Sequence, residues 1–187
     1  DNNILKEIEK TGYGVVRGVL NEQEIKESQN GFWSTMEYLT KNLEKPIDRN
    51  DENTWETYYK LDSNRNLIIQ NWKIGHSQFA WDIRQNSKLV NVFSKIWNVN
   101  NEDLLTSFDA ITFHIPPEIT QRGFHDESRS WWHTDQAPNN KEFSCIQGIV
   151  MLYDVNKGDA TLRVLEESSK YHKELFEWNG VKKNNNW

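Results

Sequence analysis

The spacing of apolar residues changes near residue 104, and this change constrains the fold more than any other feature of the sequence. Before it, apolar positions follow a helical period and form one stripe at Ile25, Phe32, Met36, Leu39 and Leu43. After it, they alternate as in a half-buried strand, at Ile111, Phe113 and Ile115. Helices followed by several β segments favour an α+β or mostly β architecture over an alternating βαβ fold.

The same patterns predict individual elements. We expect a short helix and then a strand over 3–20, with the strand at 15–20, and a second helix that begins after Asn21, with Glu24 as its capping-box partner. Another helix is predicted over 86–97, strands over 107–115, 145–153 and 161–165, and a closing helix over 168–178. Residues 45–66 are interpreted as a long surface loop. Its aromatic residues are expected to pack onto the domain, with a substrate rim as the alternative.

Length and composition narrow the class of protein. The 187 residues suit one domain, predicted to be helical over about 1–103 and β-rich from about 104. No run approaches the ~20 apolar residues of a membrane span, and the first residues lack signal-peptide features, so we expect a cytoplasmic or other intracellular protein without a membrane partner. Cys145 is the one cysteine, and 22 scattered basic residues against 28 acidic ones disfavour a nucleic-acid partner.

The pair His133-x-Asp135 is the first candidate for chemistry. Residues i and i+2 of a strand point to the same face, so the imidazole and the carboxylate can bind one metal ion, as in a 2-His-1-carboxylate triad. On spacing alone, a structural His–Asp pair is the favoured alternative. A weaker hypothesis is a zinc hydrolase that uses His125, His133 and Asp135, although no His-Glu-x-x-His motif occurs.

Several segments in order around this pair resemble the phytanoyl-CoA dioxygenase-like family of Fe(II)/2-oxoglutarate-dependent oxygenases, especially its viral and fungal relatives. The C-terminal segments that carry the resemblance are Trp131-Trp132-His133-Thr134-Asp135-Gln136 and residues 145–154, 158–165 and 168–172. The N-terminal ones are residues 12–20 and 75–84. The resemblance covers nearly the whole chain, and its order of segments is much more specific than His-x-Asp alone.

The resemblance implies a double-stranded β-helix, or cupin-like jelly roll, preceded by N-terminal helices. It implies Fe(II) as the cofactor, 2-oxoglutarate and O₂ as cosubstrates, and hydroxylation of an unknown small-molecule or lipid-like substrate. His133 and Asp135 would be two of the three metal ligands. The family's third ligand, a histidine, and its 2-oxoglutarate-binding arginine would fall after Trp187, so the domain is expected to lack its C-terminal strands. A continuation of the chain or a second polypeptide would complete it.

Three further residues are weighed against the family pattern. Gln147 and His76 are tentative cofactor-binding residues, with a buried amide satisfied by the backbone as the equal alternative for Gln147. His172 could replace the missing ligand, but a surface or helix-packing role is favoured for it. The absence of the third histidine and of any arginine after Arg163 supports an alternative function, a catalytically inactive jelly-roll binding or structural module.

Overall fold

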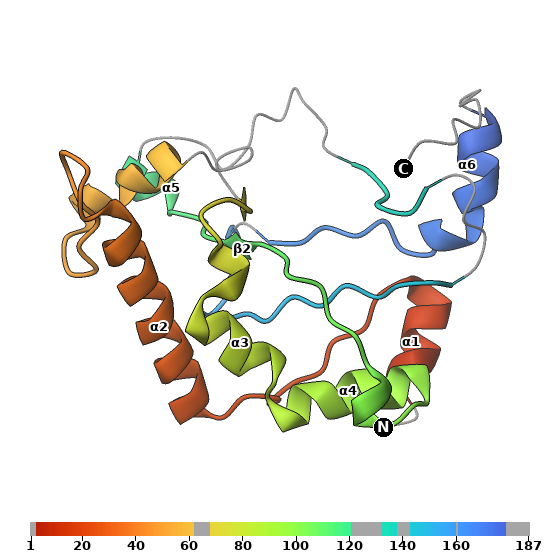
Figure 1. Ribbon diagram of the computed structural model, residues 1–187. Helices are drawn as coiled ribbons and strands as arrows, with labels where there is room; N and C mark the ends of the chain where they lie inside the picture. Colours follow the sequence, from red (N-terminus) through yellow and green to blue (C-terminus); the bar gives the residue numbers. More distant parts are fainter. Residues whose placement is uncertain (1–2, 62–67, 121–131, 138–142, 160, 179–187) are drawn as a thin grey trace. The chain divides into compact units, whose positions relative to one another are not determined.

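The computed structural model of the protein describes residues 3–61, 68–120, 132–137, 143–159 and 161–178 (Figure 1). The chain forms two compact units, each built from segments that are distant in sequence. Unit 1 comprises residues 1–17, 126–151 and 161–187, and unit 2 comprises residues 18–125 and 152–160. Among the described residues, no helix combines the length and the apolar character that crossing a membrane requires.

Unit 2 is mainly helical. Its α-helices are α2 (Glu22–Thr40), α3 (Gln78–Arg84), α4 (Ser87–Trp97) and α5 (Pro117–Thr120). Its 3₁₀ helices are η1 (Glu52–Leu61), η2 (Ile74–His76) and η3 (Asn101–Asp103). The strands β1 (Ile68–Ile69) and β2 (Ile111–Thr112) pair antiparallel, with Ile69 opposite Ile111.

The start of α2 is fixed by the predicted capping box. The side chain of Asn21 accepts a hydrogen bond from the Glu24 backbone N–H at 2.9 Å, and the Glu24 carboxylate accepts one from the Asn21 N–H at 2.7 Å. The same carboxylate also accepts hydrogen bonds from Lys88 at 2.5 Å and Asn86 at 2.9 Å, which ties α2 to the start of α4. The bond from Lys88, followed by those from Asn21 and Asn86, lowers the pKa of Glu24 to about 2.

The core of unit 2 gathers around α2. Its buried apolar residues are Phe32, Trp33, Met36, Ile47, Tyr58, Leu61, Ile69, Ile74, Phe79, Ala80 and Ile115. The ring of Phe113 lies 5.1 to 5.4 Å from the rings of Phe32, Trp33 and Tyr58, in edge-to-face geometry. The apolar face predicted for residues 111–115 therefore points into this core, as expected from alternation.

Unit 1 differs from unit 2 in that its described residues form no packed core. It contains α1 (Asn3–Thr11), η4 (Ser168–Tyr171) and α6 (His172–Trp178). The end of α1 is held by a backbone hydrogen bond from Glu167 to Thr11 at 2.8 Å and by the Tyr13 hydroxyl, which donates to Glu166 at 3.0 Å. None of the described residues of unit 1 is buried. This part of the chain is therefore joined by polar contacts rather than by a packed core.

The structure contradicts the expected jelly roll. A double-stranded β-helix needs two sheets of several strands, whereas the described residues contain one sheet of two strands with two residues each. The segments 15–20, 145–153 and 161–165 were predicted as strands, and the structure assigns none of them to a strand. Their apolar side chains remain exposed, for example Val15, Ile149 and Leu165 at 63%, 56% and 65%. Alternation indicates an extended backbone, but a strand also needs a partner to complete its backbone hydrogen bonds.

The helix predictions are confirmed. Helices are confirmed at α1, α2, α4 and, over 168–178, as η4 followed by α6. The loop predicted at 45–66 is wrong where η1 forms, but its aromatics do pack onto the core: Tyr58 is fully buried, and Trp55 and Tyr59 are partly buried against it. The short helix α3 was not predicted. Its seven residues are too few to show a clear helical period.

Candidate functional site

The two predicted metal ligands lie together in unit 1. His133 Nε2 is 3.3 Å from Asp135 Oδ1, and the two side chains are 49% and 54% exposed. The segment 132–137 contains no helix or strand, so no ladder orients the two residues. The 3.3 Å separation nevertheless shows that both polar groups lie on the same side of the segment, and their exposure leaves them open to solvent and small ions.

Gln147 joins this pair from the neighbouring segment 143–151. Its amide nitrogen donates a hydrogen bond of 2.5 Å to Asp135 Oδ2, the carboxylate oxygen that does not face His133. The Ser144 hydroxyl donates a second, longer bond of 3.4 Å to the side-chain oxygen of Gln136. Gln147 follows Ser144 in one segment, whereas its partner Asp135 precedes Gln136 in the other. The two segments therefore pair in the antiparallel sense. Side-chain hydrogen bonds thus hold the two segments next to each other.

The geometry of the pair suits one divalent cation. Two donor atoms that each lie about 2.1 Å from a cation are about 3.0 Å apart at a right angle and about 3.4 Å apart in a tetrahedron. The observed 3.3 Å between His133 Nε2 and Asp135 Oδ1 falls in this interval. Imidazole nitrogen and carboxylate oxygen are also two of the donors in the facial triad of non-haem Fe(II) oxygenases. The residues present therefore fit two of its three positions.

A third ligand is not among the described residues. Within them, no group of three His, Cys, Asp or Glu side chains is arranged to hold a metal ion. His172, for which a surface or helix-packing role is favoured over that of a substitute ligand, lies with its Nε2 at 3.3 Å from the carbonyl oxygen of Ala137 and its ring 4.9 Å from that of Phe176. This agrees with the favoured helix-packing role. His125, proposed for the zinc alternative, lies outside the described residues, as does Trp131.

Arg163 is a neighbour that the sequence did not indicate. Its guanidinium lies 5.2 Å from the ring centroid of Trp132, the residue before His133, in a cation–π contact. Trp132 is 55% exposed. The contact brings the segment 161–165 to the start of the segment that carries the candidate ligands. A contact between residues 31 positions apart leaves no local sequence signal.

His76 belongs to unit 2 and ends η2. Its ring stacks on Phe108, with centroids 4.6 Å apart and planes inclined by 32°, and it also lies 6.5 Å from Trp81. These contacts make it part of an aromatic cluster. Cofactor binding by His76 and by Gln147 stays a prediction.

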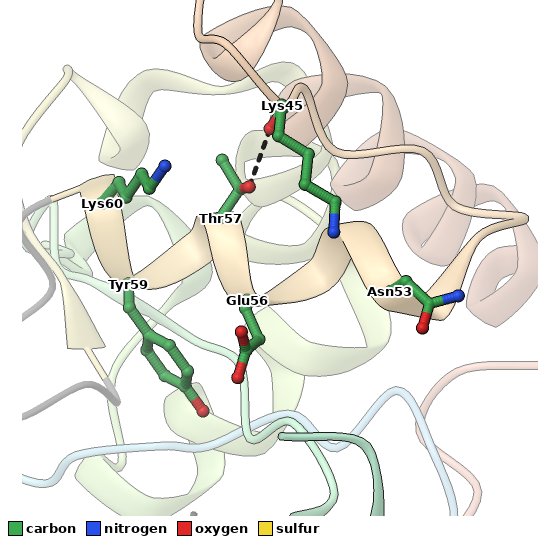
Figure 2. A pocket seen from close by; sticks show the side chains of 6 residues that line it. All are labelled: Lys45, Asn53, Glu56, Thr57, Tyr59 and Lys60. Carbon is green, nitrogen blue, oxygen red and sulfur yellow. Dashed lines mark hydrogen bonds between the residues drawn. The ribbon is translucent and has the colours of Figure 1, made fainter. Parts of the chain in front are cut away.

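A hollow of unit 2 lies along η1, within the stretch for which a substrate rim was considered (Figure 2). Its lining residues are Lys45, Asn53, Glu56, Thr57, Tyr59 and Lys60. The Thr57 hydroxyl donates a hydrogen bond of 2.7 Å to the Lys45 carbonyl oxygen, which holds the two walls of the hollow together. Two lysines and one glutamate leave it weakly cationic.

Comparison with known proteins gives one distant relative to consider. The chain is 29% identical over 136 residues to "Ava biosynthesis cluster protein O" of Aspergillus versicolor. The aligned region covers 73% of this chain and 42% of that protein, so the match spans less than half of the relative's length. No family model matches the chain, and no solved structure gives a significant match.

Proposed function

We propose that this protein is an Fe(II)- and 2-oxoglutarate-dependent dioxygenase that hydroxylates a small molecule. The observation that carries the proposal is the 3.3 Å separation of His133 Nε2 and Asp135 Oδ1 on an exposed segment. The order of sequence segments shared with phytanoyl-CoA dioxygenase-like proteins adds support. The name of the relative from Aspergillus versicolor refers to a biosynthesis cluster, which is consistent with a small-molecule substrate.

In this proposal His133 and Asp135 bind the cation through the imidazole nitrogen and one carboxylate oxygen. Binding requires the neutral imidazole and the ionised carboxylate. The chemistry that bound Fe(II) supplies is the reaction of 2-oxoglutarate, O₂ and a substrate C–H bond to give succinate, CO₂ and an alcohol. About half of each ligand side chain is open to solvent, so a dissolved cation can reach both donor atoms.

The test is anaerobic addition of Fe(II) and 2-oxoglutarate to a purified full-length version of the protein. We expect the weak visible charge-transfer band of a 2-oxoglutarate–Fe(II) complex, and succinate formation after O₂ is admitted. His133→Ala and Asp135→Ala should abolish both signals. Asp154→Asn, which alters an exposed carboxylate of unit 2, should retain both. A folded sample without the band at saturating Fe(II) and 2-oxoglutarate would refute the proposal.

A non-catalytic binding module is the second candidate. It is favoured by the exposed apolar side chains of unit 1, such as Ile149, Leu162 and Leu165, which are 56% to 65% exposed. This function predicts a chain that stays folded without metal and binds its partner equally well after His133→Ala. Loss of partner binding on addition of a chelator would exclude it.

A further inference from the structure

The two oxygens of the Asp135 carboxylate have different neighbours, Gln147 and His133. The Gln147 amide donates to Oδ2 at 2.5 Å, while Oδ1 faces His133 Nε2 at 3.3 Å. A carboxylate with both oxygens unoccupied can turn about its side-chain torsions or bind a cation through both of them. A donor on Oδ2 disfavours both options, because it restrains the plane of the carboxylate, occupies one lone pair of Oδ2 and leaves Oδ1 as the oxygen beside the imidazole.

The Asp135 carboxylate needs a hydrogen bond to fix its orientation because its side chain is exposed. The side chain is 54% exposed and lies on a segment without a backbone ladder, so packing does not restrict its rotamers. A hydrogen bond from a neutral amide to an ionised carboxylate is stronger than one between neutral groups. The amide adds no charge, so the attraction of Asp135 for a cation is preserved.

We infer that Gln147 is a positioning residue that orients Asp135 for monodentate binding of the cation through Oδ1. This inference rests on the proposed function, because it concerns the same site. It assigns Gln147 a partner, Asp135, that differs from the cosubstrate contact expected from sequence. Residues that orient a metal ligand typically contribute about 10- to 100-fold to metal affinity.

Ser144 offers a matched control within the same segment. Its hydroxyl bonds to Gln136 and does not contact Asp135 in the contacts that the structure gives, yet it links the same two segments as Gln147 does. Ser144→Ala therefore removes an inter-segment bond without altering the carboxylate. Gln147→Met keeps the length of the side chain and removes its donor, so a comparison of the two variants separates orientation of Asp135 from cohesion of the segments.

The experiment is a Co(II) titration of the full chain, followed by its visible absorption. For Gln147→Met we expect about 10- to 100-fold weaker Co(II) binding and a changed d–d spectrum, with an unaltered urea midpoint of the metal-free protein. Ser144→Ala should bind within about two-fold of wild type, and Asp135→Ala should not bind measurably.

Three other outcomes would overturn this inference. Wild-type Co(II) affinity and spectrum in Gln147→Met, with binding lost in Asp135→Ala, would overturn the positioning role and leave the proposed function standing. An equal loss in Ser144→Ala and Gln147→Met would also overturn it, since cohesion of the two segments would then explain the effect. Wild-type affinity in Asp135→Ala would refute the metal site, and with it both proposals.

Discussion

Substitution of Gly31 by alanine should destabilise the protein although it improves helix propensity. Gly31 lies in the middle of α2, where alanine is favoured over glycine by about 1 kcal/mol. A Cβ at this position would lie 2.4 Å from the Cβ of Phe79 in α3, and 3.6 Å from its Cα. Carbon atoms in contact prefer separations of about 3.5 to 4.0 Å, so α2 and α3 would have to move apart by about 1 Å.

The expected change in the free energy of unfolding is the cost of overpacking less the gain in helix propensity. Overpacking of a close-packed core costs typically about 1 to 3 kcal/mol, and the gain in propensity offsets about 1 kcal/mol of it. Phe79 is only 6% exposed and packs on Phe32, so its ring has no open space to enter. We therefore expect a net loss of about 1 to 2 kcal/mol in the free energy of unfolding, taking an overpacking cost in the upper part of this interval.

Urea denaturation followed by tryptophan fluorescence measures this loss. For an m-value of about 2 kcal/mol/M, the midpoint should fall by roughly 0.5 to 1 M. Lys26→Ala, on an exposed position of the same helix, should change the free energy by less than about 0.5 kcal/mol. An increase in the midpoint of Gly31→Ala would show that α2 and α3 do not approach as closely as the structure indicates.

Four further substitutions test the packing and charge of the chain. Met36→Ala should lower stability by about 3 kcal/mol in urea denaturation because Met36 is fully buried, whereas Met151→Ala should cost less than about 0.5 kcal/mol because Met151 is 50% exposed. The lowered pKa of Glu24 implies that its stabilisation is fully present above pH 4.5 and is lost as pH falls to about 2, so the stability difference from Glu24→Gln should vanish over that interval in thermal melts. Arg49 binds Glu37 at two points, each 2.8 Å, so Arg49→Lys should lower the urea midpoint slightly, by about 0.5 kcal/mol in free energy, and an unchanged midpoint would contradict this role.

The site was partly predictable. The spacing of His133 and Asp135 predicts that their side chains approach each other, and they lie 3.3 Å apart, although the strand on which that prediction was based does not form. The contact of Gln147 with Asp135 could not be assigned, since it depends on how the segment 143–151 folds back beside 132–137. The contact of Arg163 with Trp132 has the same origin in long-range folding.

In the fold, too, some features depend on local hydrogen bonds and others on contacts between distant parts of the sequence. The capping box at Asn21 and Glu24 and the helices α1, α2 and α4 were determined by the sequence, because their hydrogen bonds join residues three or four apart. Only the tertiary structure decided that the alternating segments 145–153 and 161–165 form no strand, since a ladder requires a partner from elsewhere in the chain. It also decided that Glu24 binds Lys88 in α4 and that Gly31 lies against Phe79, because these contacts bridge 48 to 64 positions of sequence.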